Sequence, residues 1–159
     1  MDVVSLTIAN ALVGNPVDAA AIEITVLGPD LVFERETLVA LAGADFEASL
    51  PLNRPVLVQA GSHVSITRAL RGARAYLAVA GGIAVEPVLG SRSTYIPGRF
   101  GGFEGRVLKR GDRLPLAEES AKLSQERFAS LKHKREQSVR WSVPPPTVPA
   151  REPIVLHAI

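Results

Sequence analysis

The sequence contains no cysteine, and this absence removes several kinds of chemistry from consideration. Without thiols the chain forms no disulfide, offers no thiolate ligand to a metal and has no cysteine nucleophile. Aromatic residues are also few, at 5% of the 159 residues, whereas apolar residues in total reach 47%. A chain of this length and composition can bury one sizeable core, and we expect valine, leucine, isoleucine and alanine to fill most of it.

Long apolar runs are absent as well. No stretch approaches the roughly 18 residues that a helix needs to cross a bilayer. Residues 1–4 lack the basic region that opens a secretory signal peptide. We therefore predict a cytoplasmic protein with no membrane partner.

Motifs that would identify the chemistry directly are missing. The sequence has neither the GxxxxGK[ST] phosphate loop nor the G-x-S-x-G nucleophile elbow. The three histidines, His63, His133 and His157, are not spaced like the ligands of a zinc site. We predict no metal site, and we expect any use of ATP to depend on other chains.

The formal net charge is +2, and basic residues gather at 109–113 and 132–135. Nucleic-acid binders usually add exposed aromatic side chains and a recognisable docking element to such clusters, and neither is evident here. We interpret the clusters as solvated basic faces and predict no nucleic-acid partner.

Residues 2–80 predict a mainly β domain behind one short helix. The apolar spacing over 2–13 predicts a helix, with Asp2 as its N-cap and Gly14 at its end. Alternation over 22–26 and 31–34, with a turn signal between them, predicts a hairpin. Further strands are predicted at 37–42, 46–50, 55–58, 63–67 and 74–80, the first of them buried on both faces and followed by a turn at 43–45. So many short strands indicate a β barrel or sandwich.

The glycine-rich segment 81–105 is the predicted site, because long loops inside compact domains are often functional. We single out Arg92 as the candidate catalytic residue, since its guanidinium presents a rigid fork of donors suited to a carboxylate. Gly81 and Gly82 could offer backbone amides to an oxyanion, or could simply form a tight turn. The candidate substrate-binding hydroxyls are Ser91, Ser93 and Thr94.

Four further segments are predicted beyond the loop. A strand is predicted at 106–108. The segment 117–140 predicts a charged helix, and the five prolines between 141 and 153 predict a stiff linker. Residues 154–159 resemble the first strand of a further domain.

Several stretches in a fixed order carry a family resemblance. They are ANALVGN at 9–15, AAIEIT at 20–25, RAYLAVAGGI at 74–83, VLGSRST at 88–94 and FGGFEGRVLKRGD at 100–112. Together they resemble the family of biotin-dependent carboxyltransferases and 5-oxoprolinase C subunits, which is related to allophanate hydrolase and urea amidolyase. The resemblance spans roughly residues 2–115.

The resemblance implies a cyclophilin-like β barrel over residues 1–116, flanked by a short N-terminal helix and a charged C-terminal helix. Family members usually carry one more N-terminal strand and continue into a second, similar half. The resemblance therefore implies a fragment that is incomplete at both ends and inactive alone. A likeness of fold to cyclophilin is not by itself an argument for prolyl isomerase activity.

Two parent activities follow from the resemblance, both on small amide substrates. One is an ATP-dependent 5-oxoprolinase, which opens 5-oxo-L-proline to L-glutamate with partner subunits A and B. The other is the carboxyltransferase domain of a biotin-dependent urea carboxylase, with carboxybiotin as the donor. Some relatives instead resemble non-enzymatic regulators that bind a kinase-inhibitor-like partner subunit. In neither enzyme do we assign a cofactor to this chain itself.

Overall fold

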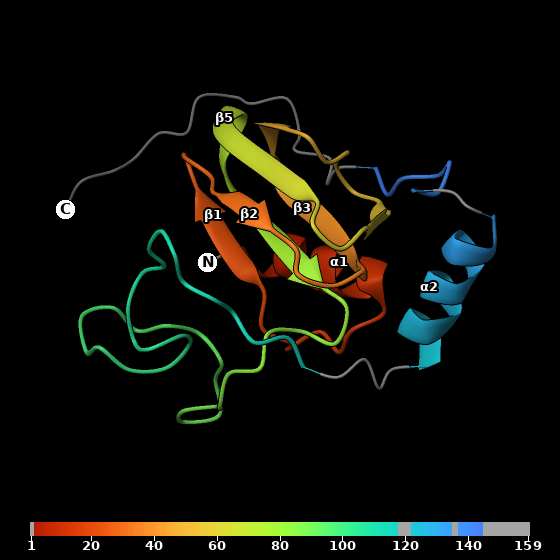
Figure 1. Cartoon of the computed structure of the whole chain (residues 1–159). Helices are drawn as coiled ribbons and strands as arrows, with labels where there is room; N and C mark the ends of the chain where they lie inside the picture. Colours follow the sequence, from red (N-terminus) through yellow and green to blue (C-terminus); the bar gives the residue numbers. More distant parts are fainter. Residues whose placement is uncertain (1, 118–121, 135–136, 145–159) are drawn as a thin grey trace.

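The computed structural model describes residues 2–117, 122–134 and 137–144. These residues confirm the predicted fold class, a mainly β antiparallel sheet with a short N-terminal helix and a C-terminal helix (Figure 1). No helix in these ranges is long and apolar enough to cross a membrane. In chain order the elements are α1 (Val3–Val13), β1 (Ile22–Thr25), β2 (Asp30–Val32), β3 (Thr37–Ala48), β4 (Pro55–Val58), β5 (His63–Val79) and α2 (Lys122–Lys134).

The long strand β5 organises the sheet. The strand order is β1-β5-β3-β4, and β2 pairs with the first part of β5. Ile22 of β1 lies opposite Leu77, whereas Leu31 of β2 lies opposite Val64. The predicted hairpin between these two segments is therefore wrong. Alternation identified both strands, but each finds its partner in a different half of β5.

The turn predicted at 43–45 is also wrong, and two pairs of predicted strands are each one continuous strand. The strands expected at 37–42 and 46–50 are one strand, β3, in which the register shifts after Gly43 instead of the chain reversing. The strands expected at 63–67 and 74–80 are likewise joined in β5. A β-bulge adds a residue and bends a strand without ending it, and its glycine resembles a turn signal in sequence.

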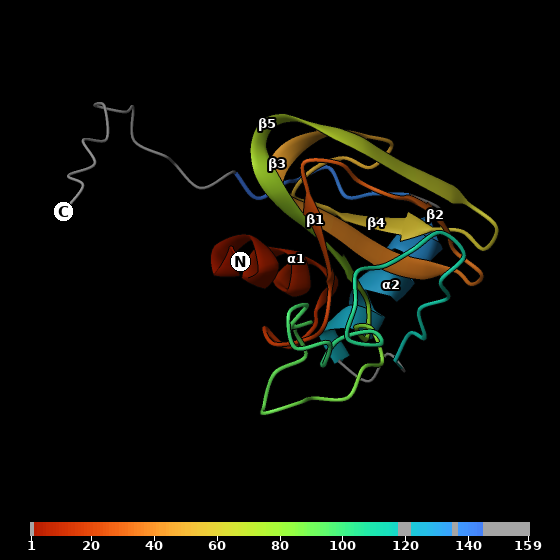
Figure 2. The same cartoon turned by 90° about the vertical axis from the view of Figure 1, so that its left-hand side faces the viewer.

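The sheet has a core on each face. Residues 37–42 of β3 are all buried, which confirms the predicted burial on both faces. Leu41, Ile66 and Leu77 belong to one cluster, whereas Leu38 belongs to the other cluster with residues of α1 and with Leu131 of α2. Figure 2 shows α1 lying along one side of the strands. The helices therefore cover one face, and the bent sheet closes over the other.

The predicted ends of the first helix are confirmed. Asp2 is the N-cap, and its carboxylate accepts a hydrogen bond from the Ser5 N–H at 3.1 Å. Gly14 ends the helix in the left-handed region, with φ of 79°. The Tyr76 hydroxyl accepts the Asp2 N–H at 2.8 Å and donates to Glu23 at 2.6 Å, which ties the start of the helix to the sheet. Burial, and then this bond to Glu23, raise the pKa of Tyr76 to about 12.

The C-terminal segment packs over the end of α1 and along the edge strand β4. The Arg127 guanidinium donates to the carbonyl oxygens of Ala11 and Leu12. Further on, the Leu57 N–H donates to the Gln137 carbonyl at 2.7 Å, so part of the β4 edge is paired. Edge strands invite association when they are left open, and this segment covers one. The predicted linker beyond residue 144 and the strand predicted at 154–159 lie outside the described residues.

Candidate functional site

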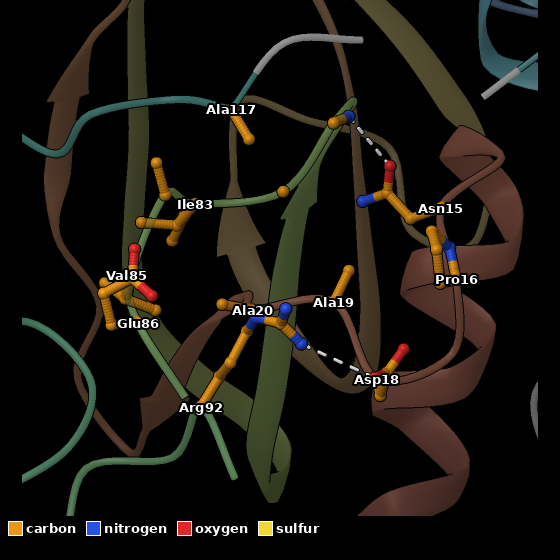
Figure 3. Close-up of a pocket in the computed structure, with 13 residues that line it drawn as sticks. Asn15, Pro16, Asp18, Ala19, Ala20, Ile83, Val85, Glu86, Arg92 and Ala117 are labelled. Atoms are coloured by element: carbon orange, nitrogen blue, oxygen red, sulfur yellow. Dashed lines mark hydrogen bonds and ion pairs between the residues drawn. The ribbon is translucent and has the colours of Figure 1, made fainter. Parts of the chain in front are cut away.

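The candidate site is a hollow of about 400 Å³ beside the end of β5 (Figure 3). Three pieces of chain form its walls: the connection from α1 to β1, the turn and extended segment after β5, and the start of the glycine-rich loop. The lining residues are Asn15, Pro16, Asp18, Ala19, Ala20, Gly81, Gly82, Ile83, Ala84, Val85, Glu86, Arg92 and Ala117. The structure thus brings together Arg92 and both glycines that were singled out from the sequence.

The connection from α1 to β1 is held from behind by two asparagines. Asn10 is fully buried on α1, and Asn15 follows the helix-ending glycine. The Asn15 amide nitrogen donates to the Val79 carbonyl at 2.8 Å, and its oxygen accepts the Gly81 N–H at 2.8 Å. These bonds join the end of the helix to the end of β5. Sequence reasoning missed this role, since an asparagine after a helix-ending glycine is typical of a simple stop signal.

The amides of the Gly81–Gly82 turn are both bonded within the protein. Both residues have left-handed backbones, with φ of 84° and 82°, which glycine adopts without strain. The Gly81 N–H donates to Asn15 and the Gly82 N–H donates to the Val79 carbonyl at 2.8 Å. Because both amides already have protein acceptors, the structure favours the tight-turn alternative over the amide cradle. The two glycines line the site, where they have no side chains to fill the hollow and where they form the turn after β5.

Arg92 lies at the rim of the hollow. Its guanidinium is 3.5 Å from the Asp18 carboxylate, and the two side chains are 39% and 75% exposed. An ion pair this long and this open to water contributes little stability. The guanidinium can therefore exchange Asp18 for a ligand carboxylate at low cost, which fits the role predicted for it.

The predicted hydroxyls lie elsewhere. Ser91, Ser93 and Thr94 are exposed, and none of them lines the hollow. The Ser93 N–H donates to the Ser91 hydroxyl at 3.1 Å, and the Thr94 side chain packs against the backbone of Gly102. Here these residues shape the loop, and direct contact with a substrate stays a prediction.

The rest of the glycine-rich loop is built around Arg106, where a strand was predicted and none forms. The guanidinium makes two bonds to the Asp112 carboxylate, at 2.7 and 2.9 Å, and one to Glu104 at 2.5 Å. The bond from Arg106, followed by one from the Lys109 N–H, lowers the pKa of Asp112 to about 2. Glu104 is thus a structural partner of Arg106. Both views show this long green and teal segment extending from the sheet (Figures 1 and 2).

Carboxylates are the remaining titratable groups at the hollow. Asp18 and Glu86 line it and were missed, since an acidic residue in a connection is most often ordinary surface. Across the described ranges, no three His, Asp or Glu side chains gather closely enough to hold a metal ion. The site therefore combines one exposed arginine, two carboxylates and a wall of small residues, which suits a small polar ligand that carries a carboxylate.

Comparisons with known proteins agree with the resemblance. The family model described as carboxyltransferase domain, subdomain A and B, matches residues 1–153. A urea amidolyase of Lachancea kluyveri is 47% identical over 121 residues, which are 73% of this chain and 7% of the relative. The 5-oxoprolinase C subunit of Escherichia coli (strain K12) is 46% identical over 121 residues, 73% of this chain and 39% of the relative.

A solved structure extends this agreement to the fold. The crystal structure of the Kluyveromyces lactis urea carboxylase superposes with a TM-score of 0.72 at 40% identity, over 76% of this chain and 12% of that one. The chain thus spans well under half the length of each of these relatives.

Proposed function

This chain belongs to the carboxyltransferase domain family with subdomains A and B, and from that membership we propose that it is a component of an ATP-dependent 5-oxoprolinase. In this role it acts with subunits A and B to open 5-oxo-L-proline to L-glutamate. The observation that carries the proposal is the 46% identity to the E. coli 5-oxoprolinase C subunit, together with an exposed arginine at the rim of the hollow.

The chemistry of the rim supports a small carboxylate substrate. 5-Oxoproline carries a carboxylate and a ring amide, and the amide oxygen gains negative charge when the ring is attacked. Arg92 is the exposed cation of the hollow and has only a 3.5 Å pairing with Asp18 to give up. We assign to Arg92 the binding of the substrate carboxylate or of the developing oxyanion.

ATP does not fit the residues of this hollow. A nucleotide phosphate needs free backbone amides or a basic cluster, and the Gly81 and Gly82 amides are already bonded. We derive no step through ATP on this chain. In this proposal its binding belongs to a partner subunit.

The exposed apolar side chains of the glycine-rich loop also suit contact with a partner. Leu89 is 91% exposed, and Tyr95 and Ile96 are each 54% exposed. Reciprocal backbone bonds between Tyr95 and Phe100 hold this part of the loop in one shape. A pre-shaped apolar loop loses little entropy on docking. We propose that one of the two partner subunits covers this loop in the assembly.

The second candidate is the carboxyltransferase domain of a biotin-dependent urea carboxylase. The superposition on the K. lactis urea carboxylase favours it specifically. Carboxybiotin would supply the carboxyl group, and Arg92 is the residue of this chain that would hold that carboxylate. Both candidate functions use Arg92 at the same rim, so an assay of the reaction is needed to distinguish them.

The test is glutamate formation from 5-oxoproline and ATP in a mixture of subunits A and B with this protein. We expect activity to require this protein and to fall by about tenfold or more in Arg92→Ala, the loss of a charge-assisted bond to the ligand. Arg110→Ala is the matched control, because Arg110 is exposed on the same loop and has no ion pair among the described residues. A verified, soluble mixture without activity would reject this reading, and carboxyl transfer from carboxybiotin to urea would then be assayed.

A further inference from the structure

Two buried asparagines lie at the hollow, Asn15 in its lining and Asn10 outside the lining. Asn10 is 0% exposed and Asn15 is 8% exposed. A buried amide is costly unless its donors and acceptor are satisfied, and an apolar residue at either position would avoid that cost. The presence of asparagine at these two positions therefore needs an explanation other than burial.

Asn15 bonds to the chain as a neighbouring strand would. Its oxygen accepts the Gly81 N–H and its nitrogen donates to the Val79 carbonyl, so one side-chain amide serves the main-chain groups of residues i and i+2. In a parallel pair of strands, a backbone residue bonds to its partner strand in the same way. The Asn15 side chain thus extends the pairing of β5 past its last strand residue and sets where the turn at 81–82 lies.

Asn10 holds the opposite wall. Its nitrogen donates to the carbonyl of Ala19 at 2.9 Å and to that of Val17 at 3.3 Å, on either side of Asp18. Its oxygen accepts from the Asn15 nitrogen at 3.2 Å, within the buried pair. One continuous set of bonds therefore runs from the Asp18 wall, through both amides, to the glycine turn. Figure 3 shows its last step, from Asn15 to the turn after β5.

We infer that Asn10 and Asn15 are positioning residues, which together fix the Asp18 wall and the Gly81–Gly82 wall relative to each other. Asn10 acts on the Asp18 wall alone, and Asn15 acts on both. The inference rests on the proposed function only in taking this hollow as the site. It predicts a fixed distance between the two walls, and this distance can be measured without any reaction.

The absence of cysteine makes the measurement direct. In the full chain, spin labels on Val17→Cys and Glu86→Cys report the distance between the walls, and a label on Glu47→Cys of β3 gives a fixed reference. We expect a narrow 17–86 distribution in the parent chain. Asn10→Leu should broaden the distribution of distances between the labels at 17 and 86 and leave that between the labels at 47 and 86 narrow. Asn15→Leu should broaden both distributions.

Global destabilisation is controlled by Ile66→Val, which removes buried volume from the core without touching the hollow. It should leave both distributions narrow. Unchanged distributions in a folded Asn15→Leu chain overturn the inference, and so does equal broadening in the Ile66→Val control. Because no substrate is involved, failure of the 5-oxoprolinase assay leaves this result intact.

A second measurement needs no substitution in the hollow, and so stands even where a leucine variant does not fold. Hydrogen exchange in the parent chain should protect the Gly81 amide by about 100-fold or more, since its acceptor is a buried side chain. The exposed loop glycine Gly90 is the comparison within the same molecule. Exchange of Gly81 as fast as that of Gly90 contradicts the inference.

Discussion

At the scale of single residues, Gly43 shows how one position decides the path of a strand. Its φ is 119°, and a Cβ atom there would lie 2.7 Å from the Arg74 carbonyl oxygen. Two requirements therefore coincide, a backbone angle that other residues rarely adopt and a close approach of β5. The bend of β3 that shapes the core depends on both.

We predict that Gly43→Ala destabilises the fold by about 2–3 kcal/mol, from backbone strain together with displacement of β5. Gly61→Ala is the matched control, because Gly61 has φ of 79° and nothing within 4 Å of a Cβ atom. It should cost only about 1–2 kcal/mol, the strain alone. Urea denaturation of both variants measures the difference, and equal losses would disprove the close-approach argument.

The Arg106–Asp112 pair predicts a pH dependence within the loop. Because the pKa of Asp112 is lowered to about 2, its carboxylate stabilises the folded loop at pH values above its unfolded pKa. That contribution is lost as the pH falls from about 4 toward the lowered value. Carbon NMR of the Asp112 carboxyl should show a midpoint near the lower value.

In Arg106→Met this midpoint should move up toward that of an ordinary aspartate, because the first cause of the lowering is removed. Asp112→Asn should abolish the signal and the acid sensitivity of the loop together. An unchanged midpoint in Arg106→Met would show that the arginine is not what lowers the pKa.

At the scale of elements, α2 is attached to the domain by a few specific contacts. Arg127 donates to carbonyls at the end of α1, and the backbone of Ser124 lies where a Cβ atom on Gly14 would fall. A cation at the C-terminal end of a helix meets unpaired carbonyls and the negative end of the helix dipole. This contact depends on the closeness of two helices far apart in the sequence.

We predict that Arg127→Met lowers the free energy of unfolding by about 1–2 kcal/mol, because the methionine keeps apolar bulk and removes the donors. Lys132→Met is the control, since the pair of Lys132 with Glu36 is partly open to solvent and should contribute less than the Arg127 contact. Hydrogen exchange over 122–134 should rise in the first variant more than in the second. The reverse order would mean that the surface pair, not the helix cap, holds α2.

At the scale of the whole molecule, an open hollow and a long loop with exposed apolar side chains lie on the same chain. Its hollow has an exposed arginine and small walls, and its long loop presents apolar side chains to solvent. An exposed apolar surface of this kind usually marks a contact with another protein surface. The chain also spans only 39% of the E. coli 5-oxoprolinase relative.

We predict that the pure 159-residue chain releases no glutamate from 5-oxoproline and ATP by itself. The reason is that ATP binding is assigned to partner subunits and the rim is open to water. A coupled glutamate assay on the purified chain checks this, with the three-component mixture as the positive control. Turnover by the pure chain would contradict both the assignment of ATP and the need for a partner.

The sequence by itself determined the ends of α1, the strands up to residue 80, the burial of 37–42 and the family. Each of these depends on neighbouring residues or on motifs in order: Asp2 caps because of its own side chain, and Gly14 ends α1 because of its own backbone. Arg92 was also proposed in this way, from the donor geometry of its side chain, and the structure places it in the lining of the hollow.

Only the tertiary structure decided which segments meet. Both β1 and β2 pair with β5 and not with each other, and the bulge at Gly43 keeps β3 whole. The Gly81 and Gly82 amides are occupied because Asn15, 66 residues before Gly81, lies against the end of β5. Hydrogen-bond partners far apart in sequence are chosen by packing, which no local pattern records. For that reason the shape of the hollow, unlike its arginine, had to come from the fold.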